Sequence, residues 1–243
     1  MALHFVADQA STAIVGGTIE LTGAEAHHAA TVRRVRDGER VTVTDGRGAW
    51  AEGAVESAQP QLVIVRIDAR TDVPAARPRL VLVQALAKGD RDEMAVQAAT
   101  ELGVDEVVPW QASRSVSRWE GRKLDKGRER WASIVREAAK QAHRAWLPEV
   151  AAPVTTGQLA QRAAGAVMVL LNPWADTALT ALDATDAAEV ILVVGPEGGI
   201  APDEIERLEA AGAVSARLGD TVLRTSTAGP AALAVLNARW GRW

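Results

Sequence analysis

The pattern of hydrophobic residues changes once along this chain, near residue 74, and that change constrains the fold more than any other feature. Before it, short strands separated by turn signals are expected at 41–44, where hydrophobic and polar residues alternate, and at 49–55 and 62–67. After it, strands that are apolar throughout alternate with helical patterns. Alternation indicates a strand with one solvated face, whereas a continuous apolar run indicates a strand covered on both faces. We therefore predict two domains of different class.

The first domain is predicted to be a small β-barrel spanning residues 1–73. The sequence Asp45-Gly46-Arg47-Gly48 is typical of a hairpin turn and joins two of the short strands. One helix, at about 24–35, interrupts them. Residues 71–78 contain two prolines and no hydrophobic periodicity, so we expect a linker there.

The second domain, residues 74–243, is predicted to be α/β. Apolar strands are expected at 80–86, 106–110, 167–171 and 190–194. Helices are expected at 91–102, 124–144, 158–164, 202–211 and 226–240. This alternation predicts a parallel sheet with helices on both faces.

Composition excludes several classes of protein. Hydrophobic residues make up 48% and charged residues 24% of the chain, which is typical of a water-soluble folded protein. No apolar run approaches the 18 or so residues of a membrane span. Residues 1–10 lack a basic stretch followed by an apolar run, so we do not expect secretion. The chain has no cysteine, which excludes disulfides, thiolate catalysis and iron–sulfur clusters. Its four histidines lack metalloprotease spacing. We expect a cytoplasmic protein without a metal.

Charge is unevenly distributed, although the net charge is only −4. Between Trp110 and Trp146, ten Lys and Arg face four acidic residues, so this segment carries +6 and the rest of the chain −10. Half of the eight tryptophans lie in it. Cations interleaved with aromatics suit phosphates and unstacked bases. A solvated helix whose tryptophans face the core explains the same pattern, and charge alone does not decide.

A glycine-rich loop follows one of the predicted strands. The strand ending at Val194 leads into Gly195-Pro196-Glu197-Gly198-Gly199-Ile200, and Pro202 then opens a helix. In a parallel sheet, ligands bind at the carboxyl ends of the strands, and glycines let the backbone approach a ligand closely. Neither the P-loop nor the GxGxxG pattern is present, and the first turn of the helix is acidic. We expect a ligand without phosphates.

A second loop, residues 218–228, passes Arg224 and enters a helix with Thr225, Ser226 or Thr227 as the expected N-cap. Together the two loops resemble the signature of the ribosomal RNA small subunit methyltransferase E family. The resemblance extends over the chain, including Gln84…Lys88, Glu101-Leu102-Gly103-Val104, Ser113-Arg114-Ser115, Trp131, Ala138…Gln141…Arg144…Pro148 and, towards the N-terminus, His4-Phe5 and Leu21-Thr22-Gly23…His27-His28…Val32-Arg33. Ser226 and Asn172-Pro173-Trp174 depart from the family pattern, where acidic residues are usual.

The resemblance implies a fold and a cofactor. Family members have a PUA-like barrel and a SPOUT methyltransferase domain, which contains a deep trefoil knot. The methyl donor S-adenosylmethionine sits in that knot between three loops. The residues implied to bind it here are Leu171, Asn172, Val194, Gly195, Pro196, Glu197, Gly198, Gly199, Ile200, Leu218, Gly219, Leu223, Arg224, Thr225, Thr227 and Ala228.

The resemblance also implies the reaction, methylation of N3 of a uridine in 16S ribosomal RNA within the 30S subunit. Uracil N3 must lose a proton, and arginine stabilises the resulting anion because it stays charged. Arg224, Arg114 and Lys88 are the candidate catalytic residues. The candidate RNA-binding residues are Arg33, Arg34, Arg36, Ser115, Gln141 and Arg144. The barrel carries a net −3, so it is expected to position a structured RNA through a few arginines rather than bind strands by bulk charge. A homodimer is expected, because the closing helix is rich in Ala and Leu.

Three alternatives stay open. One is a SPOUT enzyme that methylates another base or a ribose 2′-oxygen. Another is a ribosome assembly factor that binds RNA without catalysis. The third is a nicotinamide-dependent oxidoreductase, which the missing dinucleotide fingerprint disfavours.

Overall fold

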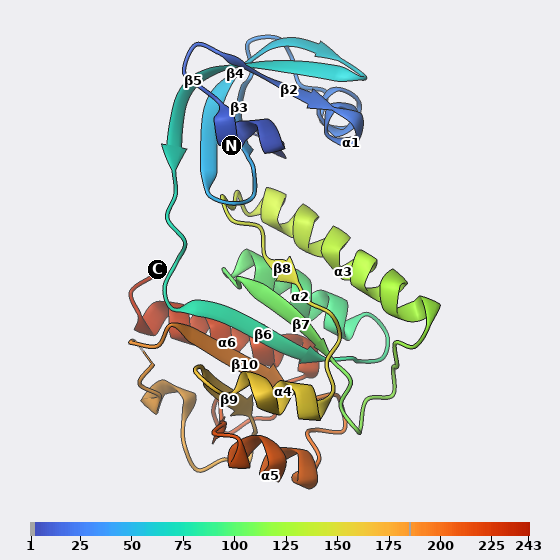
Figure 1. Ribbon diagram of the computed structural model, residues 1–243, viewed down its shortest axis with the longest axis vertical. Helices are drawn as coiled ribbons and strands as arrows, with labels where there is room; N and C mark the ends of the chain where they lie inside the picture. The colour runs from blue at the N-terminus through green and yellow to red at the C-terminus, as the bar shows by residue number, and fades with distance from the viewer. Residues whose placement is uncertain (1–2, 185) are drawn as a thin grey trace. The chain divides into compact units, whose positions relative to one another are not determined.

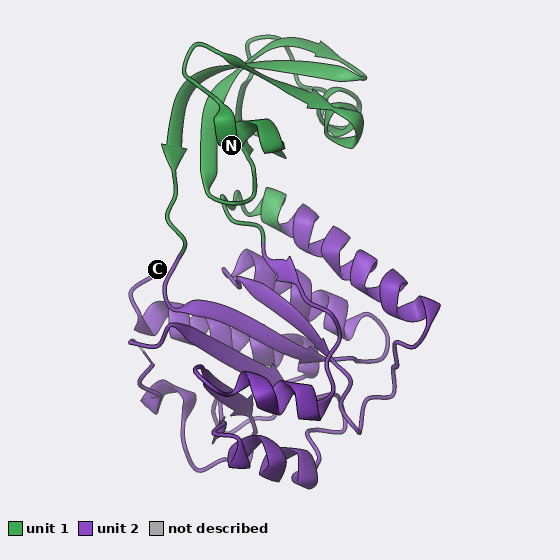
Figure 2. Ribbon diagram, in the orientation of Figure 1, with its two compact units in different colours: residues 1–75, 139–147 green, residues 76–138, 148–243 purple. Residues whose placement is uncertain are grey.

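The computed structural model describes residues 3–184 and 186–243, which form two compact units (Figure 2). Unit 1 comprises residues 1–75 and 139–147, and unit 2 comprises residues 76–138 and 148–243. The first break lies two residues beyond the expected one at 73/74. The segment 139–147 corrects the domain prediction, because it packs with the first unit although it lies in the middle of the second by sequence.

Unit 1 is built on a five-stranded sheet in the order β1-β3-β4-β5-β2. Its strands are β1 (Leu3–Val6), β2 (Thr18–Thr22), β3 (Arg40–Thr44), β4 (Ala49–Gln59) and β5 (Leu62–Asp72). Figure 1 shows the long strands β4 and β5 curving strongly. Two irregularities in their pairing contribute to this bend. At one of them Gly53 is required, because a Cβ there would overlap the carbonyl of Arg66.

The concave face of this sheet encloses a core in which Phe5, Ile19, Leu21 and Ile67 are buried. A short helix α1 (Gly23–His27) runs directly into a π-helical turn η2 (His28–Val32), and a 3₁₀ turn η1 (Asp8–Thr12) follows β1. The helix expected at 24–35 is therefore shorter. Strands β1 and β2 were missed because each is short and lies next to polar residues or glycine.

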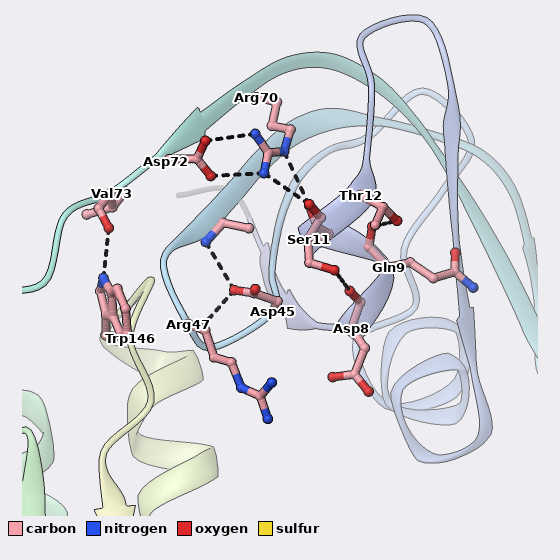
Figure 3. A network of polar contacts seen from close by, with 12 residues as sticks. Asp8, Gln9, Ser11, Thr12, Asp45, Arg47, Arg70, Asp72, Val73 and Trp146 are labelled. Atoms are coloured by element: carbon pink, nitrogen blue, oxygen red, sulfur yellow. Dashed lines mark hydrogen bonds and ion pairs between the residues drawn. The ribbon is translucent and has the colours of Figure 1, made fainter.

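Segment 139–147 is tied to unit 1 by hydrogen bonds. The backbone N–H of Gly48 donates to the carbonyl of Ala145 at 3.0 Å, and that of Leu147 donates to the carbonyl of Gly46 at 3.0 Å. The indole of Trp146 donates to the carbonyl of Val73 at 2.8 Å (Figure 3). The turn expected at Asp45–Gly48 thus forms backbone hydrogen bonds with segment 139–147, which is about 100 positions away in the sequence.

A second set of contacts in Figure 3 holds the N-terminal turn against β5. The guanidinium of Arg70 donates to both carboxylate oxygens of Asp72, at 3.0 and 2.9 Å, and to the carbonyl of Ser11 at 3.1 Å. The Asp45 carboxylate accepts from the backbone N–H groups of Arg47 and Ala49 and so shapes the β3–β4 turn. Arg70, Asp72 and Asp45 therefore have a structural role, because their side chains hold the turns at this end of the sheet in place.

Unit 2 contains a six-stranded parallel sheet in the order β11-β9-β10-β6-β7-β8 (Figure 1). The strands are β6 (Arg79–Ala85), β7 (Glu106–Trp110), β8 (Glu149–Val150), β9 (Val167–Leu171), β10 (Glu189–Val194) and β11 (Val214–Ala216). Every pair of neighbours is parallel. This confirms the predicted α/β class. The short edge strands β8 and β11 were not predicted.

Helices cover both faces of this sheet. The helices are α2 (Arg91–Glu101), α3 (Arg122–Gln141), α4 (Thr156–Arg162), α5 (Pro202–Ala210) and α6 (Thr225–Arg239), with a 3₁₀ turn η3 (Leu179–Ala181). Leu80 and Leu82 of β6 point into the core beneath α2, α3 and α6, whereas Val81 and Val83 point into the core beneath α4 and α5. A strand buried on both faces explains the continuous apolar run.

The apolar closing helix α6 is explained largely by its own unit. Ala232, Leu233 and Leu236 are buried in the core beside β6 and β10. At Gly229 a Cβ would lie 2.9 Å from Leu82, so the helix approaches the sheet closely. The hydrophobicity of α6 therefore does not by itself indicate a dimer. None of the described helices is long and apolar enough to cross a membrane.

The tryptophans of the basic segment between Trp110 and Trp146 pack inside the protein or make structural contacts. Trp110 and Trp131 are buried, and Trp119 packs edge-on against Trp131 with ring centroids 5.2 Å apart. Trp146 is the residue bonded to Val73. The solvated-helix interpretation is thus correct for the aromatics, while cations such as Arg122 and Lys126 remain exposed.

Candidate functional site

One cavity of about 750 Å³ lies at the carboxyl ends of three neighbouring strands of unit 2. The loops after β9, β10 and β11 all contribute to its wall, which includes Leu171, Val194 and Leu223. These strands are adjacent in the sheet, so their ends meet at the same edge, where ligands of parallel sheets bind. The position of the cavity follows from strand order.

The glycine loop after β10 has a conformation that larger residues would disturb. Gly199 has φ +72°, in the left-handed region that favours glycine, and its N–H donates to the carbonyl of Pro196 at 2.9 Å. At Gly195 a Cβ would lie 2.8 Å from Ile200, so glycine is needed there for space. Gly198 is different, because a Cβ there would make ordinary contacts with Arg114.

A buried relay of hydrogen bonds joins this loop to the start of α6. The amide of Gln84, at the end of β6, donates to the hydroxyl of Thr225 at 2.8 Å. That hydroxyl donates to the carbonyl of Gly195 at 2.8 Å. The expected N-cap role of Thr225, Ser226 or Thr227 is wrong, because α6 begins at Thr225 with Arg224 as N-cap and no side-chain cap. Thr225 instead connects two of the cavity loops.

Glu197 of the glycine loop is held by hydrogen bonds from Lys88 and Arg91. Its carboxylate accepts from the backbone N–H of Lys88 at 3.0 Å and from the guanidinium of Arg91 at 2.8 Å. Burial alone would raise the pKa of Glu197, but hydrogen bonds from its own backbone, from Lys88 and from Arg91 outweigh it and lower the pKa. Glu197 is therefore an anion at neutral pH, fixed to the β6–α2 loop.

Arg114 reaches the glycine loop from the segment after β7. Its guanidinium donates to the carbonyl of Gly198 at 3.0 Å. The neighbouring Ser113 is anchored by buried Glu204, which accepts from its N–H at 3.0 Å and its hydroxyl at 2.9 Å. Glu204 also accepts from the Thr156 hydroxyl at 2.6 Å. The backbone next to Arg114 is therefore fixed in position by Glu204.

Most of the residues expected to hold the donor line this single cavity. The exceptions are Leu218, Gly219 and Thr227, which lie in the β11–α6 loop or the first turn of α6 but not in the cavity wall. Of the candidate catalytic residues, Arg114 and Arg224 line the cavity. Lys88 does not, although its backbone N–H contacts Glu197.

The cavity also contains residues that sequence reasoning missed, namely Arg91, Pro173, Trp174, Pro202, Ile205 and Val222. Arg91 lies in a different predicted element, and nothing in the local sequence pairs it with Glu197. Trp174 and Pro173 directly follow a predicted strand, so the rule that ligand sites lie at strand ends was a usable signal for them.

The residues expected to contact RNA are divided between the units. Arg33, Arg34 and Arg36 are exposed in unit 1, and Arg34 has φ +55°. Gln141 and Arg144 also belong to unit 1, through segment 139–147. Ser115 belongs to unit 2 and is buried, with a hydroxyl that has no hydrogen-bond partner among the described residues.

Family models match both parts of the chain. Residues 75–237 match an RNA methyltransferase domain, and residues 21–68 match an RNA methyltransferase PUA domain. The first match covers the whole parallel sheet and its cavity. The second covers most of the curled sheet of unit 1.

Relatives and solved structures resemble the chain over nearly its full length. Ribosomal RNA small subunit methyltransferase E of Mycobacterium bovis is 45% identical over 94% of this chain and 89% of its own, and that of Bacillus subtilis is 31% identical over 90% of each. Among structures, the Neisseria gonorrhoeae enzyme of that name bound to S-adenosyl methionine has a TM-score of 0.89 at 25% identity, covering 99% and 98% of the two chains. A putative methyltransferase from Legionella pneumophila with bound SAM has a TM-score of 0.87 at 30% identity and covers 98% of each.

Proposed function

This chain belongs to the ribosomal RNA small subunit methyltransferase E family, and we propose that it transfers a methyl group from S-adenosylmethionine to N3 of a uridine in 16S ribosomal RNA. One observation carries the proposal most directly. The loops that follow β9, β10 and β11 line a common cavity at the carboxyl edge of a parallel sheet. The similar structures from Legionella pneumophila and Neisseria gonorrhoeae both contain this methyl donor.

The residues of the cavity fit this donor. Leu171, Val194 and Leu223 offer apolar surface for an adenosine, and the glycine loop offers backbone groups at close range. When bound, S-adenosylmethionine supplies an electrophilic methyl group. The chain's own residues must bind the uracil and stabilise it as the proton on N3 leaves.

We infer that Arg224 is the main cationic group toward the uracil. N3 of uracil is weakly acidic, and a nearby guanidinium stabilises the anion that remains when its proton leaves. Arg224 is exposed and lines the cavity at the N-terminus of α6. Arg114 lines the same cavity, but its guanidinium is hydrogen-bonded to the carbonyl of Gly198, so we propose that its main role is to hold the glycine loop in shape. Lys88 is a candidate substrate-side group outside the cavity wall.

We further propose that unit 1 positions the RNA. Arg33, Arg34 and Arg36 are exposed together at the end of η2, where guanidinium groups suit phosphates. Gln141 and Arg144 are further candidate RNA contacts in unit 1, and Ser115, whose side chain is buried, is a candidate in unit 2. The substrate is proposed to be the assembled 30S subunit, which presents a structured RNA. Because segment 139–147 packs with unit 1, point substitutions test this role better than removal of residues 1–73.

Three further properties belong to the same proposal. The trefoil knot of SPOUT enzymes is proposed from the family resemblance alone, for the stretch that forms the three cavity loops. A homodimer is proposed from the family resemblance, with the half-buried Ala231, Ala234 and Val235 of α6 as the apolar surface available to it. A light-scattering mass of 25.7 kDa would overturn the dimer.

The proposed location is the cytoplasm, and no metal is required.

Calorimetry with S-adenosylhomocysteine, followed by mapping of the methyl group in digested RNA, tests the proposal. We expect saturable binding to the full chain and a product methylated at uracil N3. A methyl group on a ribose 2′-oxygen or on another base would assign the chain to a different reaction of the same cofactor. Binding of RNA without binding of the donor would instead indicate an assembly factor.

A further inference from the structure

Trp174 is an unusual residue in this chain because its indole is exposed on the rim of the cavity. It is 83% exposed, whereas Trp110 and Trp131 are buried. Val222, which is 66% exposed, lines the same cavity from a different loop. Exposing large apolar side chains to water is unfavourable, so a rim built from two of them indicates a partner surface.

The backbone beneath Trp174 is held rigidly. The Asn172 side-chain oxygen accepts from the N–H of Trp174 at 3.1 Å, and its carbonyl accepts from the N–H of Ala175 at 3.1 Å. From the far side, the N–H of Asn172 donates to the carbonyl of Ala216 at 3.0 Å, and the guanidinium of Arg217 donates to the carbonyl of Ala175 at 2.8 Å. The indole therefore projects from a fixed turn.

The charges around the same cavity favour a nucleic acid as the partner. Three arginines line it, Arg91, Arg114 and Arg224. Arg91 is neutralised by Glu197, and Arg114 is bonded to a carbonyl, which leaves Arg224 as an exposed cation with no ion pair among the described residues. Trp174 and Arg224 line the same cavity, and a site that combines an exposed flat aromatic with a free cation is suited to unstacked bases and their phosphates.

We propose that Trp174 is a stacking platform for a base of the RNA substrate that has left its helical stack, an inference that rests on the proposed function. The apolar residues Leu171, Val194 and Leu223 are less exposed than Trp174, and they provide the apolar surface that the proposed function assigns to the donor. The indole lies outside them, where it meets the RNA strand entering the cavity. Trp174 thereby determines which strand conformations reach the reactive site, without contacting the methyl donor.

The test uses the full chain with S-adenosylhomocysteine bound and 30S subunits that lack the modification. Trp174→Ala should weaken binding to these subunits about ten-fold, the size expected for loss of one stacked base. Trp174→Phe should restore most of the affinity, because a phenyl ring still stacks. The affinity for S-adenosylhomocysteine should be the same in all three proteins. Trp243→Ala is the matched control, since Trp243 is 67% exposed but lies outside the cavity.

Two results would overturn the stacking role. Equal binding of 30S subunits by wild type and Trp174→Ala would remove the platform. Loss of S-adenosylhomocysteine affinity instead would assign the indole to the donor. Failure of the proposed function is distinguishable from both, because it would appear in the wild type as bound donor without methylated uridine.

Discussion

The hydroxyl of Thr225 donates a 2.8 Å hydrogen bond to the carbonyl of Gly195, a residue 30 positions earlier in the chain. The same hydroxyl accepts from buried Gln84 at 2.8 Å. Thr225→Val keeps the shape of the side chain but removes both bonds. We expect it to lower the affinity for S-adenosylhomocysteine by about ten-fold, because an unmade buried hydrogen bond costs about 1–3 kcal/mol. Calorimetry measures this directly.

Two variants make that experiment specific. Thr225→Ser retains the hydroxyl and should retain most of the affinity. Thr227→Val changes an exposed residue of the same turn that lies outside the cavity wall and should have no effect. If Thr225→Val bound the donor as the wild type does, the relay would not shape the site.

Gly199→Val should abolish donor binding while the fold survives. Gly199 has φ +72°, and a β-branched residue is strongly disfavoured there. Gly198→Ala is the control, because a Cβ at Gly198 meets only ordinary contacts. Circular dichroism checks the fold, and calorimetry checks the binding. Unchanged affinity in Gly199→Val would remove this loop from the site.

Stability at acid pH should depend on Glu106, at the start of β7. Its buried carboxylate contacts Arg162 at 2.8 Å and Arg79 at 2.7 Å. Burial alone would raise the pKa of Glu106, but the two guanidinium groups outweigh it and lower the pKa. The stabilisation is therefore present above the unfolded pKa of 4.5 and is lost as the pH falls through the folded value.

We expect Glu106→Gln to lower the free energy of unfolding by about 3 kcal/mol at pH 7, because it removes the buried carboxylate that Arg162 and Arg79 share, although Arg79 keeps its ion pairs with Glu149 and Glu189. The difference from the wild type should shrink as the pH falls below 4.5. Urea unfolding at several pH values measures it. A difference that stayed constant with pH would exclude the carboxylate charge as its source.

A second pH effect should arise from His4 in unit 1. Burial lowers the pKa of His4 to about 4. The hydrogen bond to the Arg144 carbonyl and the charge of Glu25 oppose this shift, whereas His143 and Lys140 add to it. Between its ordinary pKa of 6.5 and about 4, the unfolded chain takes up a proton that the folded chain does not. Unfolding free energy should therefore fall by up to about 3 kcal/mol as the pH drops through this window.

The variant His4→Asn should lack that pH dependence, since asparagine can still bond the Thr42 hydroxyl, which lies 2.7 Å from Nδ1 of His4. His27→Asn, at an exposed position, should keep the wild-type profile. Identical profiles for His4→Asn and wild type would show that another group titrates.

Much of unit 2 could be predicted from the sequence because its signals are local. Strands 106–110 and 167–171 were predicted to the residue, since strands buried on both faces give continuous apolar runs. The glycine loop was found because it follows a predicted strand, whereas the strand β11 before the Arg224 loop was not predicted. The sheet brings the ends of both strands to the same edge.

The rest depends on contacts that no local pattern encodes. Segment 139–147 joins unit 1 through backbone bonds from Gly48 to Ala145 and from Leu147 to Gly46, and a backbone bond has no sequence signature. The pairing of Arg91 with Glu197 spans 106 positions. Thr225 looked like a helix cap, because the preference of threonine for N-caps is local while its bond to Gly195 is not.

The measurement that tests the central claim most directly is methyl transfer from labelled S-adenosylmethionine to 30S subunits that lack the modification. The full chain should place one methyl group on N3 of a single uridine of 16S ribosomal RNA, identified by digestion and mass spectrometry. Naked 16S RNA should be a poorer acceptor, and Arg224→Ala should be impaired in transfer while still binding S-adenosylhomocysteine. Transfer to a ribose oxygen, or equal transfer to a short oligonucleotide containing one uridine, would contradict the account.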